Sequence, residues 1–168
     1  RNIGGSFKGA QTNRLRAIEQ RKLYQAKGRE EAQQDNQLHL IGCMLYWAEG
    51  AKSRNCLNFV NSDTRMMQLY VQFLRDALKI DEEDIVMHII SHYENPIDIA
   101  HVESYWLECL NLPATCLRKT VYKEGGKSRR NILEYGVCSV RVYKTEVVQR
   151  VYGAIKEYGG FDNPDWLY

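Results

Sequence analysis

Basic side chains gather in two segments of the chain, where they could neutralise a polyanion. Residues 114–131 carry six Lys or Arg and one acidic residue, and residues 1–36 carry eight against four. Between them, residues 37–113 carry five basic and eleven acidic residues. Each phosphate that a cation neutralises releases a counterion, so clustering of this kind favours a nucleic-acid partner. The alternative is an ordinary solvated surface, which is what most runs of charge provide.

The carboxylate of Glu49 stands at the end of an apolar stretch, LIGCMLYWAEG at residues 40–50. Apolar residues recur there at steps of three and four, which predicts a helix that is apolar nearly all round and therefore buried. A carboxylate at the C-terminal end of a helix opposes the helix dipole. Lys52 or Arg54 could compensate it by forming an ordinary ion pair.

Other residues with chemical potential give weaker signals. His88 and His92 are four apart in a predicted strand, so both would face the same side of the sheet. They could be ordinary sheet residues, phosphate contacts or a pair of metal ligands. No Ser-His-Asp order and no Gly-rich phosphate loop before a helix is present. The cysteines are an odd number, widely spread and without a Cys-x-x-Cys pair, which predicts buried free thiols rather than disulfides or zinc. They are Cys43, Cys56, Cys109, Cys116 and Cys138.

The whole chain has the composition of one folded domain. It has 168 residues, a net charge of +2, 44% hydrophobic residues and only 3 prolines, which excludes collagen-like and disordered classes. No apolar run approaches the roughly 20 residues that a membrane helix needs. We expect a soluble, intracellular protein in the cytoplasm, associated with the nucleoid when it binds DNA, with no membrane partner.

Periodicity and breaker residues predict an α+β fold in which helices and four strands alternate. The expected sheet is mixed or antiparallel, with helices on one face. Asn61-Ser62-Asp63, Asn95-Pro96 and Thr145 are expected to begin helices. The expected helices span 14–34, 38–49, 64–78, 95–112 and 145–158, and the expected strands span 56–60, 85–93, 117–123 and 136–143. Residues 1–37 are predicted to form a basic helical extension, 38–158 the main domain and 159–168 a tail that is loop or docks by its aromatic residues.

The last two strands are expected to form a hairpin with one uncovered face. Because side chains alternate along a strand, Lys119, Val121 and Lys123 would share one side, and Ser139, Arg141 and Tyr143 would share one side of the partner strand. Such a face could read a nucleic-acid groove, although an ordinary solvated face is nearly as compatible with the pattern. The predicted nucleic-acid contacts are Lys52, Arg54, Arg118, Lys119, Lys123, Lys127, Arg129, Arg130, Ser139 and Arg141.

An ordered set of short motifs resembles the LAGLIDADG homing-endonuclease superfamily, in a divergent single-motif branch found in bacterial and phage proteins. The similarity covers about residues 38–158. It is carried by Ala48-Glu49-Gly50 at a helix end, Asn61-Ser62-Asp63, Tyr105-Trp106 and Tyr135-Gly136-Val137-Cys138. A helix between the first two strands departs from the family, in which a hairpin follows the motif.

The resemblance implies that two copies pair through the 38–50 helix and place a carboxylate at the centre of the DNA site. Glu49 then occupies the metal-ligand position for Mg²⁺, and Gly42 supplies a small residue for close packing of the two helices. Met44 stands where the family commonly has Gly. A homodimer of this kind would prefer a roughly palindromic duplex. Lys119 or Lys123 would act in catalysis, by polarising the attacking water or by stabilising the transition state.

Three functions follow as hypotheses. The first is sequence-specific binding of double-stranded DNA by a homing-endonuclease-like protein whose nuclease activity is retained or lost. The second is an active Mg²⁺-dependent DNA endonuclease that uses Glu49. The third is a protein-interaction module without nucleic-acid binding, in which the basic segments are incidental.

Overall fold

The computed structural model describes residues 3–93, 95–123 and 133–168, with side chains from residue 9 onward. The fold is α+β, as predicted, and contains a four-stranded mixed sheet in the order β1-β4-β2-β3. Strand β4 is antiparallel to both of its neighbours, whereas β3 is parallel to β2. The strands are β1 (Leu57–Asn61), β2 (Ile85–Ser91), β3 (Val121–Tyr122) and β4 (Val137–Val142).

The predicted hairpin between 117–123 and 136–143 is wrong, because β2 lies between β3 and β4. Strand β4 buries Cys138, Val140 and Val142 completely, so it gains most when strands flank it on both sides. The predicted strand 117–123 has no such apolar alternation. Only two of its residues, Val121 and Tyr122, form β3, at the edge of the sheet.

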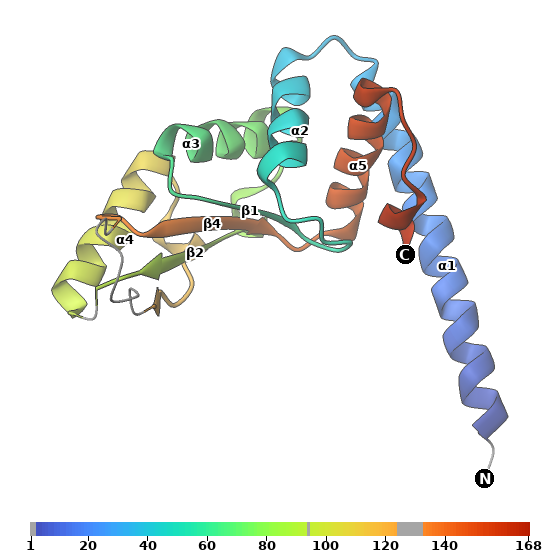
Figure 1. The fold of residues 1–168 in the computed structure, drawn as a ribbon, viewed down its shortest axis with the longest axis horizontal. Helices are drawn as coiled ribbons and strands as arrows, with labels where there is room; N and C mark the ends of the chain where they lie inside the picture. The colour runs from blue at the N-terminus through green and yellow to red at the C-terminus, as the bar shows by residue number, and fades with distance from the viewer. Residues whose placement is uncertain (1–2, 94, 124–132) are drawn as a thin grey trace.

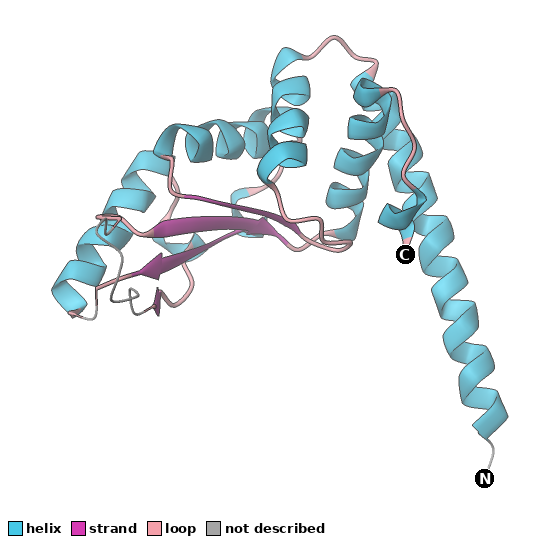
Figure 2. Cartoon of the chain, in the orientation of Figure 1, coloured by secondary structure: helices cyan, strands magenta, loops and turns pink. Residues whose placement is uncertain are grey.

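Among the described residues, helices cover one face of the sheet and none covers the other (Figures 1 and 2). Helices α2, α3 and α5 lie over that face, and α4 packs against α3 and β2. Helix α3 continues into a π-helical turn, Phe73–Ala77. The helices are α2 (Gln37–Glu49), α3 (Thr64–Gln72), α4 (Pro96–Leu110) and α5 (Thr145–Gly159).

All three predicted helix starts are confirmed, since α3, α4 and α5 begin at these positions. The Asp63 carboxylate accepts from the amides of Arg65 and Met66, and the Asn95 side chain accepts from the amide of Ile97. Thr145 begins α5 but does not cap it: Lys144 precedes the helix without a capping bond, and the Thr145 hydroxyl donates to Asn55 Oδ1 instead. A hydroxyl that finds a partner on another segment is lost to its own helix end.

The core between sheet and helices is rich in aromatic residues. Phe59 stacks on Tyr70 with 4.6 Å between ring centroids, and Trp106 is fully buried. The prediction of free thiols is confirmed, since all five cysteines are free and three of them are buried. Burial raises the pKa of the Cys43 and Cys138 thiols, which keeps them protonated and unreactive.

Helix α1 (Ile3–Ala32) is longer than the predicted 14–34 helix and begins well before it. Its C-terminal half packs along α5, and the stretch 9–16 is exposed and extends away from the sheet (Figure 1). A Cβ added at Gly28 would lie 1.9 Å from the Arg150 carbonyl oxygen, and one added at Gly153 would lie 2.0 Å from that of Gln25. Gly28 therefore allows the backbones of α1 and α5 to come into contact. From the sequence alone, a glycine in a helix indicates only a loss of helix propensity.

Residues after α5 hold α1 and α5 together. Trp166 stacks on Tyr152 at 4.5 Å, and Phe161 stacks on Trp47 of α2 at 5.2 Å. Lys156 is 3% exposed, and its ammonium group donates to Gln25 of α1 and pairs with Asp162. Of the two arrangements considered for this tail, docking by aromatic residues is the one observed.

Candidate nucleic-acid interface

The sheet surface that faces away from the helices, here called the open face, is built from alternate residues of three strands. Two rows of three residues cross the sheet in register, and their side chains lie on the open face. The rows are Asn58–Arg141–Val86 and Val60–Ser139–His88. Their sequence neighbours Phe59, Val140 and Met87 are fully buried on the other side. Strand β4 is flanked on both sides, so its Arg141 lies on an inner strand of the open face, one residue before the end of β4.

Arg141 is held by neighbouring side chains. Its Nε donates to Ser139 Oγ at 3.0 Å, and its Nη1 donates to Tyr143 Oη at 3.2 Å. Ser139 is 2% exposed, and its hydroxyl donates to Asn58 Oδ1 at 2.9 Å. Ser139, predicted as a nucleic-acid contact, thus lies beneath the guanidinium and orients it.

His88 lies on the open face, close enough to Arg141 and Arg118 to feel the charge of both. The Arg118 amide donates to the Met87 carbonyl at 2.9 Å, which places Arg118 beside His88. Burial, followed by the charges of Arg141 and Arg118, lowers the pKa of His88 below 6.5. Within the described residues neither arginine forms an ion pair with a carboxylate. The described part of the open face therefore carries two arginine charges that no ion pair offsets.

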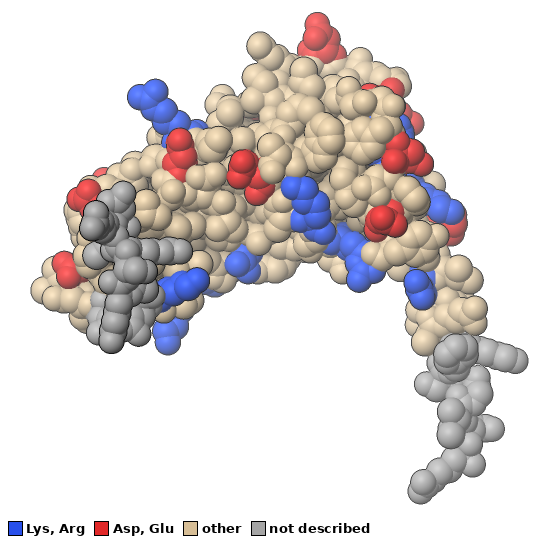
Figure 3. All heavy atoms as spheres, in the orientation of Figure 1, with Lys and Arg blue, Asp and Glu red and all other residues tan. Residues whose placement is uncertain are grey.

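The edge of the sheet at β3 adds two lysines. Lys119 and Lys123 flank this strand and are exposed. His92 lies beyond the end of β2, and its Nδ1 bonds to the Lys123 carbonyl at 2.8 Å. Figure 3 shows basic side chains along the side of the molecule below the sheet, whereas most acidic ones in this view lie above it.

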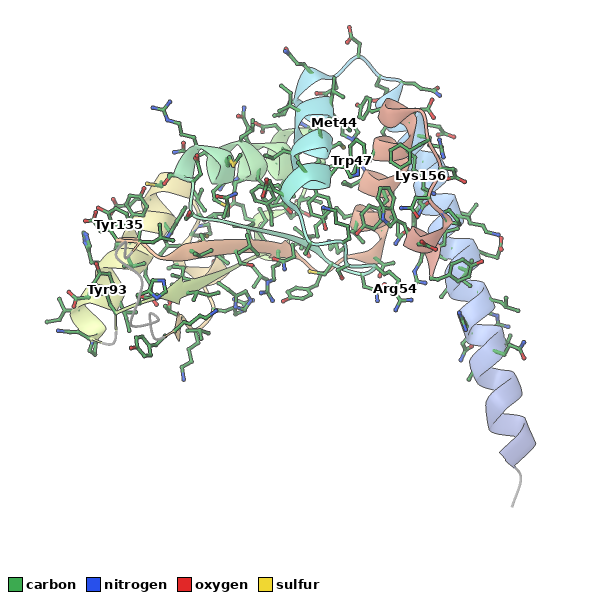
Figure 4. The ribbon with its side chains drawn as sticks, viewed as in Figure 1. Met44, Trp47, Arg54, Tyr93, Tyr135 and Lys156 are labelled. Atoms are coloured by element: carbon green, nitrogen blue, oxygen red, sulfur yellow. The ribbon has the colours of Figure 1, made fainter. Side chains whose placement is uncertain are left out.

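The opposite end of the open face carries Lys52 and Arg54, in the loop between α2 and β1. The loop is fixed to α5, because Gln149 donates to the Arg54 carbonyl at 3.0 Å and Tyr152 donates to that of Ser53 at 2.8 Å. Figure 4 shows Arg54 near α1 at one end of the sheet, with Tyr93 and Tyr135 at the other. The Lys52 ammonium donates to the Gly50 carbonyl, and no ion pair of Glu49 occurs between described residues.

The predicted partnership of Glu49 with Lys119 or Lys123 at one phosphate is not formed within a chain. Gly50 lies beside Phe59 on the outer side of β1. From Phe59 the row of paired residues crosses the sheet through Val140 and Met87 to Leu117. Four strand spacings separate its ends, roughly 15–20 Å. The two ends of the predicted catalytic set therefore lie at opposite edges of the sheet.

A metal site is likewise incomplete in one copy. In the part of the chain that the structure describes, no three His, Cys, Asp or Glu side chains come together. Glu49 is an exposed carboxylate and belongs to no such group. One chain by itself does not fit Mg²⁺, a cation that takes several oxygen ligands.

The prediction that α2 is buried all round is wrong. His39, Gly42, Cys43 and Tyr46 are buried, but Leu40, Ile41 and Trp47 are 39–41% exposed. The helix rests on the core by one side only, because β1 and α3 leave its other side uncovered.

The structure and the sequence prediction of the interface differ in some residues. Lys127, Arg129 and Arg130 lie outside the described residues. Asn58 was not predicted, although its alternation with the buried Leu57 and Phe59 could have placed it on the open face.

Comparisons with protein families, with curated proteins and with solved structures find no match for this chain. Among the described residues, no helix combines the length and the apolar character needed to cross a bilayer.

Proposed function

We propose that this chain is a sequence-specific double-stranded DNA-binding protein of LAGLIDADG homing-endonuclease type, with the open face as its DNA contact. The observation that carries the proposal is a sheet face that no helix covers among the described residues, with Arg141 on an inner strand, Arg118 beside His88, and no carboxylate paired to either arginine in that part of the chain. Sheet strands can enter a DNA groove, where side chains reach the base edges and flanking cations contact phosphates.

Titration of random and selected duplexes at several salt concentrations tests this function. Affinity should fall steeply with salt, because each phosphate contact contributes about 0.9 to the slope of log affinity against log salt. One duplex sequence should be retained selectively. If no duplex binds at low salt, the proposal is refuted and a protein-interaction module becomes the better reading.

A homodimer through α2 forms part of the proposal. Leu40, Ile41 and Trp47 give this helix an exposed apolar side. Gly42, which the resemblance assigns to the helix pair, instead faces the core, since an added Cβ would lie 2.1 Å from the Phe73 ring. Large side chains rather than glycine would therefore form this contact.

We expect Ile41→Glu to convert a dimer into a monomer, because a charge buried in an apolar contact is costly. Sedimentation of wild type and variant at equal concentration measures the change. Ile97→Glu is the matched control, since Ile97 is 77% exposed on α4 and lies away from α2. Equal behaviour of Ile41→Glu and wild type would argue against this contact.

Cleavage of DNA with Mg²⁺ is the second candidate function. It is favoured by the exposure of Ala48 and Glu49 at the end of α2, next to the apolar side through which two copies would meet. We expect Glu49→Gln to abolish cutting of the selected duplex and to leave binding largely intact. Cutting by that variant would remove Glu49 from catalysis.

DNA affinity is expected to increase severalfold as the pH falls from 7.5 to 5.5. Burial and the charges of Arg141 and Arg118 lower the pKa of His88, so its ring is neutral in the free protein at pH 7.5. Nearby phosphates favour the protonated ring and raise this pKa, so binding takes up a proton and is tighter at low pH. Duplex titrations across this range should show the increase for wild type and a smaller one for His88→Gln; equal increases would exclude His88.

A further inference from the structure

Arg141 is held by two hydrogen bonds to side chains, whereas Lys52 and Arg118 each donate one, to the carbonyls of Gly50 and Thr115. The Nε and Nη1 of Arg141 donate to Ser139 and Tyr143, and Ser139 is itself bonded to Asn58. A side chain held in this way loses less conformational entropy on binding than a free one. Lys119 and Lys123, by contrast, are exposed side chains at the edge of the sheet.

The remaining donors of Arg141 match one base. A guanidinium has five N–H groups. Two of those of Arg141 are used, and the three that remain, two of them on Nη2, have no partner among the described residues. In the major groove guanine presents the acceptors N7 and O6 side by side, which a guanidinium can bind with two parallel bonds. A mobile lysine suffices for a phosphate, whereas this pairing needs a fixed fork.

The position of Arg141 agrees with base reading. It lies on β4, which has a neighbouring strand on each side, and Ser139 below it is 2% exposed. A duplex resting on the open face would bring its base edges over the centre of the sheet and its phosphates over the edges. We infer that Arg141 reads one guanine of the DNA target through N7 and O6 and that Ser139 positions it, an inference that rests on the proposed function.

The test uses the duplex that wild type retains from a random-sequence library. Each guanine is replaced singly by 7-deazaguanine, which removes the N7 acceptor and preserves base pairing. At one guanine, this replacement should weaken wild-type binding about 5- to 100-fold. For Arg141→Lys, which keeps the charge but loses the fork, the same replacement should have no further effect.

Two more variants separate reading from folding and from charge. Ser139→Ala should reduce the effect of 7-deazaguanine at the same position while the thermal unfolding temperature stays close to that of wild type. It also carries the test if Arg141→Lys fails to fold. Lys123→Gln should weaken binding to all duplexes alike, reduce the salt slope by about one, and keep the full effect of the guanine replacement.

The inference is overturned if no guanine replacement loses its effect in Arg141→Lys or is reduced in Ser139→Ala. A lower salt slope in Arg141→Gln, with unchanged base preference, would assign Arg141 to a phosphate and leave the DNA-binding function standing. If wild type retains no sequence selectively, the proposed function fails, and the inference fails with it.

Discussion

Replacing Lys119 and Lys123 together by glutamate is expected to weaken DNA binding on the order of a hundredfold at moderate salt. Both lysines are exposed at the β3 edge of the open face. The variant loses two phosphate contacts, which lowers the slope of log affinity against log salt by about two. It also places two carboxylates where they repel the duplex. Titration of a labelled duplex at several salt concentrations gives both the affinity and the slope.

The matched control is Arg65→Glu with Lys79→Glu, which changes the net charge by the same amount. Arg65 lies in the first turn of α3 and Lys79 follows the π-helical turn, and both are exposed on the helix-covered side of the molecule. This variant should bind DNA within a few-fold of wild type. Equal losses in the two variants would show that only net charge matters and would contradict the assignment of the open face.

Gly28→Ala is expected to destabilise the packing of α1 on α5 by about 2 kcal/mol, although alanine favours a helix. The added Cβ would lie 1.9 Å from the Arg150 carbonyl oxygen, so the two helices must move apart. Separation also stretches the buried bonds of Gln25 with Gln149 and Lys156. Urea unfolding, together with hydrogen exchange of the α1 amides, measures the loss.

Gly9→Ala makes the same change in the same helix without the contact. A Cβ at Gly9 meets nothing within 4 Å. This variant should therefore stabilise α1 by up to about 1 kcal/mol, the difference in helix propensity. If both alanine variants are stabilising, the close approach of α1 and α5 is not a real constraint on stability.

Local signals in the sequence predict the helices and strands of this fold better than they predict which of these elements lie side by side. Asp63 and Asn95 are bonded to amides two or three residues away, so sequence alone is enough to place these helix starts. The pairing of β4 with β2 rather than β3 depends on contacts across about fifty residues, which no local pattern encodes. Gly28 illustrates the same limit, since the reason for a glycine there is the backbone of Arg150, far away in the chain.

The candidate site divides in the same way. Alternation places Arg141 and Ser139 on one side of a strand, as observed, but it cannot show that Ser139 is covered by the guanidinium above it. The distance between Glu49 and Lys119 follows from strand order, which the sequence does not supply. Position 42 needs a glycine because the Phe73 ring packs against it. The motif alone does not distinguish this contact within the chain from a contact between two copies.

Neither border of the sheet can recruit a strand from another molecule. At one border β3 offers only two residues, and at the other the Ala51 amide already donates to the Asn58 carbonyl and Gly50 lies beside Phe59. Short or capped borders protect a protein from edge-to-edge aggregation. Self-association by continuing the sheet is thereby disfavoured, and the proposed homodimer would have to form through the helices.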